Sequence, residues 1–582
     1  MESERERGKR MKKIGCLALS LLILSVVFVG LVSCGKGGAS DVTTYAETAA
    51  VTAAETEEIL YEIPTVYNGH DILEGTYTIA GTAFSFKYSD GFFEVDPKEY
   101  QTHMATTSMS LSYSATKGPA GDDYTACYDQ TLSMFRQIGF DNVYVSPSYN
   151  VEPTADSVAC VIAEKAVECQ RGTTNVVAIV LRSGSYCSEW ASNFRLGSEG
   201  ESAGIASAAD QVIGYFSDFL SENQDLTTAL EDGKVAFWVQ GYSRGGGVAN
   251  LTAKRLVDLY QPSGNDVYAY PIDGQMGGVK SAEIPGRDYT VIHNVVNPND
   301  LVPYLAPARM GFKRYGLDHY LFSGKADVNN PILDANGDPV SDNKRLVTMS
   351  VKRIALAKKH LVEMLGDVPA VERYTPYAVS YKAINLFTRE LADVERKTMT
   401  ANFLYDFMNG LTETADGDPV TTRESFVSSG MEAALGRLMV FFYSGVDFSG
   451  FTDIDPLKEI AYAVLEECKD ALTESAYWGN YGKMTVSLHG DIARILTEAL
   501  VPRLREVETL RTLLAEYPEG GADRAFDDLA ILVHRFLYAI SDIDDLVTFA
   551  LNAVSLTGNH EYLANLALLR SYDSWFEPTI TD

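Results

Sequence analysis

The chain has 582 residues, of which 46% are hydrophobic and 11% aromatic, so it is long enough for two or three domains with buried cores. Its formal net charge of −31 at pH 7 argues against a nucleic-acid partner, whose phosphates require a basic surface, and against electrostatic attachment to anionic lipid. An acidic surface of this kind favours solubility outside the cell.

Residues 1–34 have the organisation of an export signal, with a basic start and an uncharged apolar stretch over residues 14–32. The stretch ends in Leu31-Val32-Ser33-Cys34-Gly35, which resembles the lipobox of bacterial lipoproteins. That resemblance implies that Cys34 is acylated and anchors the protein to the extracytoplasmic face of the bacterial cell membrane. The alternative is a signal anchor retained as one transmembrane helix.

Residues 35–60 predict a flexible tether, because Gly, Ala, Ser, Thr and Glu predominate there. Residues 61–345 alternate strand and helix patterns, which indicates an α/β fold with a mostly parallel sheet flanked by helices. Strands are predicted in a small β region around 77–86 and over 142–145, 157–167, 176–181, 235–239, 267–271 and 291–297. Helices are predicted over 101–115, 126–138, 203–220 and 248–260.

The pattern changes after about residue 346, where helical periodicity replaces strand signals. Residues 346–545 therefore predict a large all-helical cap, inserted before a carboxyl-terminal segment, 546–582, that returns to the first domain. Helices are predicted over 351–365, 387–409, 431–442, 457–472, 492–517, 525–540, 546–553 and 562–570.

The stretch from Val235 to Gly247 combines an apolar strand, a sharp turn and a helix. The turn reads Gly241-Tyr242-Ser243-Arg244-Gly245, a G-x-S-x-G match in the context of a nucleophile elbow. Glycines suit this turn because a β-carbon on either side of the serine would meet the neighbouring backbone. A second match, at Ser202, follows polar loop residues and predicts only a loop that enters a helix.

A serine nucleophile needs a histidine base and an acid that orients it. Asp300 follows the predicted strand 291–297, at the strand end where such an acid belongs. Of the 8 histidines, His560 and His319 fit best: His560 lies in a loop after the cap, and His319 follows the acid closely. The Ser, Asp, His order favours His560, and we expect the His319 stretch to run past the sheet edge.

Four segments resemble the class 3 (fungal-type) lipases, in their bacterial lipoprotein form: VVAIVLRSGSYCSEWASNF, WVQGYSRGGGVAN, VVNPNDLVPYLAP and GNHEYLANLALL. The resemblance implies an α/β-hydrolase domain over residues 61–345 with Ser243 as nucleophile, Asp300 as acid and His560 as base. It also places oxyanion donors at the backbone of Arg244 and at Ser183 or Gly184. The chain departs from the compact lipases at Tyr242, where they usually have His, and at Arg244, where they usually have Leu.

These residues predict a serine hydrolase that cleaves carboxylic esters, lipid or acylglycerol-like, through an acyl-enzyme, with no metal or cofactor. The alternatives are an acyltransferase or small-ester esterase on the same residues, and a non-catalytic, ligand-binding surface lipoprotein. We also predict that Glu189 pairs with the guanidinium of Arg244, since a buried cation needs a partner. No cysteine spacing suggests a zinc site. Cys160 and Cys169 are able to pair, but we expect mostly buried free thiols.

Overall fold

The computed structural model describes residues 64–79, 81–116, 127–151, 153–155, 157–183, 189, 191–297, 300, 302–306, 308–321, 356–366, 427, 430–443, 455–473, 494–539 and 560–576. The predicted signal, the tether, Cys34, Gly184 and the helices predicted over 387–409 and 546–553 lie outside these residues.

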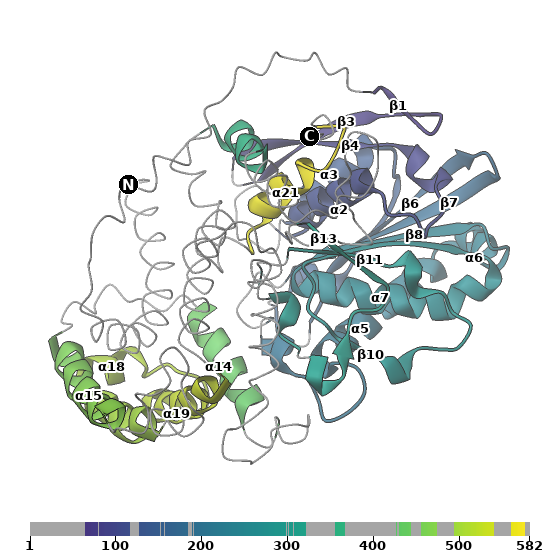
Figure 1. The fold of residues 1–582 in the computed structure, drawn as a ribbon. Helices are drawn as coiled ribbons and strands as arrows, with labels where there is room; N and C mark the ends of the chain where they lie inside the picture. Colours follow the sequence, from purple (N-terminus) through teal and green to yellow (C-terminus); the bar gives the residue numbers. More distant parts are fainter. Residues whose placement is uncertain are drawn as a thin grey trace.

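A seven-stranded sheet, drawn in the right-hand part of Figure 1, has the strand order β13-β11-β9-β8-β7-β6-β5. The five strands from β7 to β13 run parallel to one another, and β5 and β6 pair antiparallel at the other edge. The strands are β5 (Asn142–Val145), β6 (Cys160–Cys169), β7 (Gly172–Leu181), β8 (Val235–Tyr242), β9 (Asp266–Ile272), β11 (His293–Val296) and β13 (Leu317–Tyr320). The predicted α/β class, with a mostly parallel sheet, is therefore confirmed.

Alternating side chains of the central strands face two separate cores, as the period of two along a strand requires. Phe237 and Val239 of β8 face the core that α5 (Ala203–Ser221) and α7 (Arg244–Tyr260) cover. Trp238 faces the other core, beneath α2 (Thr102–Ser114), α3 (Tyr128–Gln137), α21 (Tyr562–Arg570) and the hairpin of β3 (Leu73–Ile79) and β4 (Thr82–Tyr88). Helices thus flank the sheet on both faces (Figure 1).

The structure corrects the sequence prediction at the edge of the sheet. The stretch with His319 does not run past the sheet but forms its edge strand, β13, paired parallel with β11. Asn250 of α7 holds the segment that leads into β13. Its side chain donates to the Tyr315 carbonyl at 2.8 Å and accepts from the Tyr315 N–H at 3.1 Å. Leu317–Tyr320 is too short for its alternation to be read from sequence alone.

The described helices between residues 431 and 539 form a third apolar cluster, apart from the two cores of the sheet. They are α14 (Met431–Tyr443), α15 (Asp455–Thr473), the π-helical turn η10 (Leu496–Leu500), α17 (Val501–Arg505), α18 (Glu508–Leu513) and α19 (Gly521–Ala539). The single helix predicted over 492–517 is wrong, because the chain breaks at the extended Val507. Helical conformation continues through residues 494–505, with the π-helical turn just before Pro502, which lacks a backbone N–H. Inside the cluster Arg437 pairs with the buried Asp528 at 2.7 Å.

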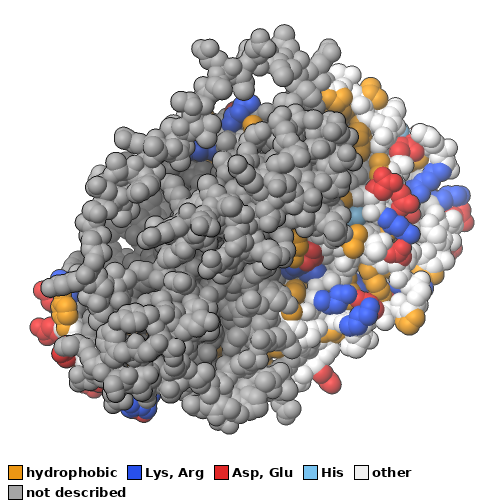
Figure 2. Space-filling model, viewed as in Figure 1, with side chains coloured by type: hydrophobic (Ala, Val, Ile, Leu, Met, Phe, Trp, Pro, Cys, Tyr) orange, Lys and Arg blue, Asp and Glu red, His pale blue; other side chains and the backbone are white. Residues whose placement is uncertain are grey.

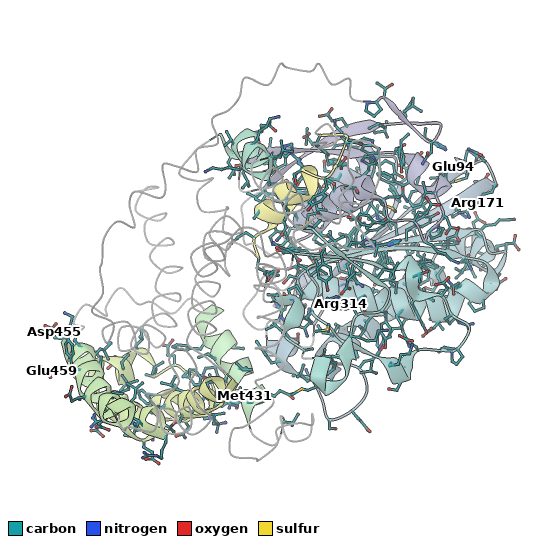
Figure 3. The ribbon with its side chains drawn as sticks, viewed as in Figure 1. Glu94, Arg171, Arg314, Met431, Asp455 and Glu459 are labelled. Atoms are coloured by element: carbon teal, nitrogen blue, oxygen red, sulfur yellow. The ribbon has the colours of Figure 1, made fainter. Side chains whose placement is uncertain are left out.

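The two parts of the molecule meet where α14 packs against the 3-10 turn η4 (Ala191–Phe194). In Figure 3, Met431 at the start of α14 lies near the sheet part, whereas Asp455 and Glu459 of α15 lie on the far side of the helices.

Figure 2 shows acidic, basic and hydrophobic side chains interspersed on the visible described face of the sheet part. Among the described residues, no helix combines the length and apolarity needed to cross a membrane.

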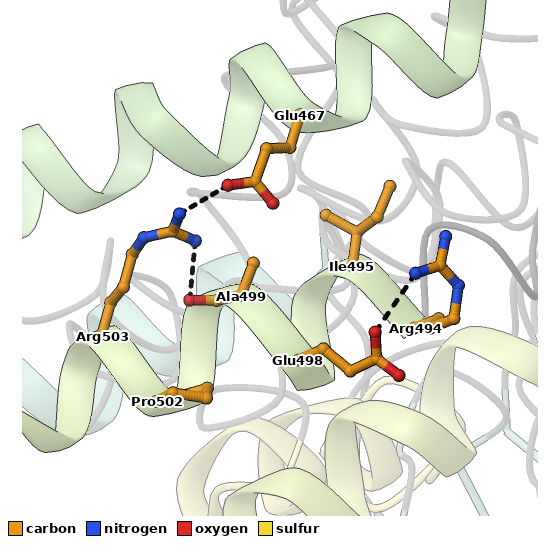
Figure 4. A pocket seen from close by; sticks show the side chains of 7 residues that line it. All are labelled: Glu467, Arg494, Ile495, Glu498, Ala499, Pro502 and Arg503. Atoms are coloured by element: carbon orange, nitrogen blue, oxygen red, sulfur yellow. Dashed lines mark hydrogen bonds and ion pairs between the residues drawn. The ribbon is translucent and has the colours of Figure 1, made fainter.

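A cavity of about 400 Å³ opens between α15 and the η10–α17 stretch (Figure 4). Its charged lining residues pair with one another, Arg503 with Glu467 at 2.5 Å and Arg494 with Glu498 at 3.1 Å. The cavity contains none of the residues that the sequence assigns to chemistry.

Candidate active site

Ser243 lies at the turn between the end of β8 and the start of α7, in a backbone conformation that L-residues rarely adopt. Its φ is 60° and its ψ is −127°, and its N–H donates to the Ile272 carbonyl of the neighbouring strand at 3.0 Å. Strain of this kind, on a residue other than glycine, gathers at functional sites. The turn lifts the serine hydroxyl off the carboxyl end of the central strand.

The glycines on either side of Ser243 are required by contact with neighbouring backbone. A β-carbon on Gly241 would lie 2.3 Å from the Gly245 carbonyl oxygen, and one on Gly245 would lie 3.0 Å from the carbonyl oxygen of Arg182. The first distance is impossible without movement of the backbone, and the second is tight. Both glycines of the motif thus serve the turn itself.

Three side chains from distant parts of the chain meet at this turn. The ring of His560 lies with Nε2 at 2.6 Å from the Ser243 hydroxyl oxygen, although the two residues are 317 positions apart. Its Nδ1 makes a hydrogen bond with Oδ2 of Asp300, which follows β11 and is fully buried. The structure therefore brings together Ser243, Asp300 and His560, the residues that the sequence grouped.

The segment with His560 is held in place by contacts with the amino-terminal half of the sheet part. Asp573 Oδ1 accepts a hydrogen bond from His103 Nδ1 at 2.6 Å, and the rings of His103 and Trp575 stack with centroids 4.2 Å apart. Lys87 donates to the Trp575 carbonyl at 2.6 Å, and Arg570 donates to the Ser85 carbonyl at 2.7 Å. Residues 560–576 thus belong to the sheet part, and α21, with residues 562–570 as predicted, is part of its core.

Burial and pairing act in opposite directions on Asp300. Desolvation raises the pKa of its carboxyl, while the charge and hydrogen bond of His560 and the Val302 N–H, at 2.9 Å, lower it. The two oxygens accept from different elements, one from the histidine and one from the backbone of the turn. The carboxyl is thereby fixed in the orientation in which it holds the imidazole.

A second buried carboxyl, Asp273, lies next to this site and was missed from sequence. It follows β9 directly, has a φ of 46°, and accepts from the Asn297 N–H at 2.6 Å. Burial and the negative charge of Asp300 raise the pKa of Asp273 well above its usual value, against the opposing effects of Asn297 and Arg314. Its position after a parallel strand, like that of Asp300, was the available signal.

Replacing Asp273 by asparagine is expected to stabilise the protein, increasingly so as the pH rises from about 4 to 7. An acid with a raised pKa keeps its proton in the folded state after the unfolded chain has released it at about pH 4. The wild-type stability therefore falls with rising pH in this window, and the neutral amide removes that loss. Thermal midpoints of both proteins at pH 4 and pH 7 test this; an advantage of the asparagine variant that shrinks toward pH 7 would contradict it.

The predicted oxyanion donors differ in their availability. Arg244 is the first residue of α7, so its backbone N–H lies among those that have no carbonyl partner within the helix. The Ser183 N–H donates to Thr116 Oγ1 at 3.0 Å, and this hydrogen bond occupies the donor that the sequence assigned to oxyanion binding. Gly184, the other residue of that prediction, is not among the described residues.

The predicted ion pair between Glu189 and Arg244 does not form in the structure. Glu189 pairs instead with Arg182, whose Nη2 lies 2.6 Å from Glu189 Oε1. The Arg244 side chain reaches the next turn, where Nε donates to Ser192 Oγ at 2.7 Å, and Ser192 in turn donates to the Glu189 carbonyl at 2.7 Å. Burial lowers the pKa of Arg244, and the charge of Glu189 opposes that effect.

The competing sequence candidates have structural partners elsewhere. Ser202 precedes α5 as its N-cap residue, as the loop prediction requires. His319 makes a hydrogen bond with His293 at 3.0 Å, and its ring stacks on Tyr100 at 4.0 Å. Cys160 and Cys169 are buried free thiols and do not pair with each other, and Cys127 is buried as well. No group of acidic, histidine and cysteine residues arranged to hold a metal ion occurs within the described part of the chain.

Comparisons with known proteins add little to this geometry. No family model matches the sequence, and no curated protein matches it. Among solved structures, the crystal structure of M37 lipase is similar at 15% sequence identity and a TM-score of 0.25, over 36% of this chain and 70% of that chain. A likeness of this extent carries no functional weight, so the chemistry has to be inferred from the chain's own residues.

Proposed function

We propose that the protein is a serine hydrolase that cleaves carboxylic esters through an acyl-enzyme. The observation that carries this proposal is the hydrogen-bonded series Ser243–His560–Asp300 at a strained strand-to-helix turn. A serine hydroxyl is a weak nucleophile until a base accepts its proton, and the base needs an acid that fixes its ring. Each of these requirements has a side chain at hydrogen-bonding distance.

The geometry supports a two-step reaction. His560 Nε2 takes the proton as Ser243 Oγ attacks the ester carbonyl, and it then gives that proton to the departing alcohol oxygen, leaving the acyl group on Ser243. A water molecule, deprotonated by the same nitrogen, attacks the acyl-enzyme; the acid leaves and Ser243 regains its proton. Asp300 holds Nδ1 throughout and stabilises the imidazolium that forms in each step.

The negative charge on the carbonyl oxygen needs donors that are already in place. We assign the first to the Arg244 N–H, at the positive end of the α7 dipole. We assign the second to the loop after β7, at Gly184, because Thr116 already binds the Ser183 N–H. Substrates with lipid-like acyl chains are proposed from the resemblance of the four segments to class 3 lipases.

Hydrolysis of p-nitrophenyl esters of increasing acyl length tests the reaction and its substrate together. We expect the full-length protein to hydrolyse these esters, with a preference for longer acyl groups, as a lipid-like substrate requires. A maximum at acetate would favour a small-ester esterase, and transfer of the acyl group to an added alcohol in preference to water would favour an acyltransferase. Folded protein without activity on any ester would contradict the proposal.

We also infer from the amino-terminal sequence that the protein is anchored to the membrane through acylated Cys34. Cys34→Ala is expected to leave the precursor unprocessed or to release the protein from membranes, because thioether formation needs that thiol. Fractionation of cells that express either form, with mass spectrometry of the mature amino terminus, measures the effect. A mature wild-type protein that still begins at Met1 would overturn this inference.

A further inference from the structure

A buried chain of hydrogen bonds joins the three segments that carry Ser243, Asp300 and His560. Its centre is Asn565 of α21, whose Nδ2 donates to the Tyr242 hydroxyl at 3.0 Å and whose Oδ1 accepts from Asn297 Nδ2 at 2.9 Å. All three residues are at most 1% exposed. Tyr242 directly precedes the serine, Asn297 begins the turn with Asp300, and Asn565 lies one helical turn beyond His560.

Each partner of Asn565 contacts the catalytic residues in turn. The Tyr242 ring stacks on the ring of His560, with centroids 5.1 Å apart and planes 21° apart. The Asn297 carbonyl accepts from the Asp300 N–H at 3.0 Å, which fixes the start of the turn that presents the acid. One amide side chain therefore connects the strand before the nucleophile, the turn before the acid and the helix after the base.

The hydrogen bonds of Asn565 give α21 a directional contact that apolar packing does not supply. All residues of α21 are buried, and the burial of apolar surface is favourable without being directional. A buried amide is different, because a shift by one residue would leave its donors and acceptors buried without partners, which is unfavourable. Together with the hydrogen bonds at Arg570, Asp573 and Trp575, Asn565 thus fixes a segment that returns to the site 260 positions after Asp300.

We propose that Asn565 is a positioning residue, which places the His560 ring between Ser243 and Asp300 through its hydrogen bonds to Tyr242 and Asn297. This inference rests on the proposed serine hydrolase function. It predicts that loss of the amide lowers the rate of the chemical step and leaves substrate binding unchanged. A misplacement of about 1 Å at a reacting group is enough to lower turnover roughly 100-fold.

The test compares Asn565→Ala with Asn265→Ala in the full chain. Asn265 is also buried and bridges several elements, but it lies at the opposite end of the sheet, where it accepts from the Val235 N–H at 3.0 Å and donates to the Leu230 carbonyl at 2.9 Å. Values of kcat and KM for a p-nitrophenyl ester are measured for both variants, well below their thermal midpoints. We expect Asn565→Ala to lower kcat by about 10- to 100-fold with an unchanged KM, and Asn265→Ala to leave both constants near the wild-type values.

A second variant keeps the test decisive if Asn565→Ala fails to fold. Tyr242→Phe removes one hydroxyl and retains the ring that stacks on His560, so a lower kcat at constant KM again supports the proposal. Equal losses of kcat in the Asn565 and Asn265 variants, or wild-type kcat in a folded Asn565→Ala or Tyr242→Phe protein, would overturn it. A wild-type protein that hydrolyses no ester would instead contradict the proposed function.

Discussion

Replacing Ser243 by alanine is expected to abolish ester hydrolysis, with a loss of about 10⁶-fold in kcat, as for other triads that lose their nucleophile. No other described hydroxyl has a histidine ring placed as His560 is placed here, with Nε2 at 2.6 Å from the Ser243 oxygen. Thermal stability is expected to stay close to the wild-type value, since the change removes one small polar atom and leaves the glycines of the turn intact. Steady-state kinetics and thermal unfolding of the same preparations measure both effects.

The matched control is Ser202→Ala, which alters the second G-x-S-x-G match of the chain. Ser202 stands at the N-cap of α5, and its hydroxyl donates only a long hydrogen bond, 3.4 Å, to the Arg195 carbonyl. We expect this variant to keep wild-type turnover. If the Ser202 variant lost activity and the Ser243 variant retained it, the assignment of the nucleophile would be reversed.

The second large effect is expected at the base, where His560→Ala should lower kcat by about 10³- to 10⁶-fold. Without the imidazole no group accepts the Ser243 proton, and the buried Asp300 carboxylate loses the hydrogen-bond partner of its Oδ2. His319→Ala is expected to change kcat by a few-fold at most, because His319 contacts His293 and Tyr100 within the sheet edge. Both variants are compared in the same ester assay.

Comparing the losses of activity in the two histidine variants also tests the proposed Ser, Asp, His order of the catalytic residues along the chain. A greater loss for His319→Ala than for His560→Ala would contradict the base assignment. It would also contradict the interpretation of the helical segment as an insertion between acid and base. Partial recovery of the His560→Ala variant by added imidazole would support a role in proton transfer over a purely structural one.

Strong local patterns made the sheet and the nucleophile turn predictable. The continuous apolar runs of β7 and β8 indicate strands buried on both faces, and G-x-S-x-G after β8 requires glycine at Gly241 for contact with the Gly245 backbone. His560 was selected by chain order together with the family resemblance. Its contact with Ser243 depends on the docking of residues 560–576, which includes the His103–Asp573 and Arg570–Ser85 hydrogen bonds.

Features that depend on long-range partners were not predictable in the same way. Arg182 and Arg244 both lie near Glu189, and only the fold decides that Arg182 makes the ion pair. Asp273 has no motif of its own, and its burial beside Asp300 follows from the neighbouring positions of β9 and β11. Asn565 lies within an apolar helix pattern, where a single polar residue gives no indication of its partners.

The most direct test of the central claim is to locate the adduct of a fluorophosphonate probe on the folded protein by peptide mass spectrometry. Such probes react with a serine that a neighbouring base has activated. The geometry predicts one modified residue, Ser243, with labelling abolished in Ser243→Ala and strongly slowed in His560→Ala. An adduct on a different residue, or no adduct on folded wild-type protein, would contradict the proposed serine hydrolase.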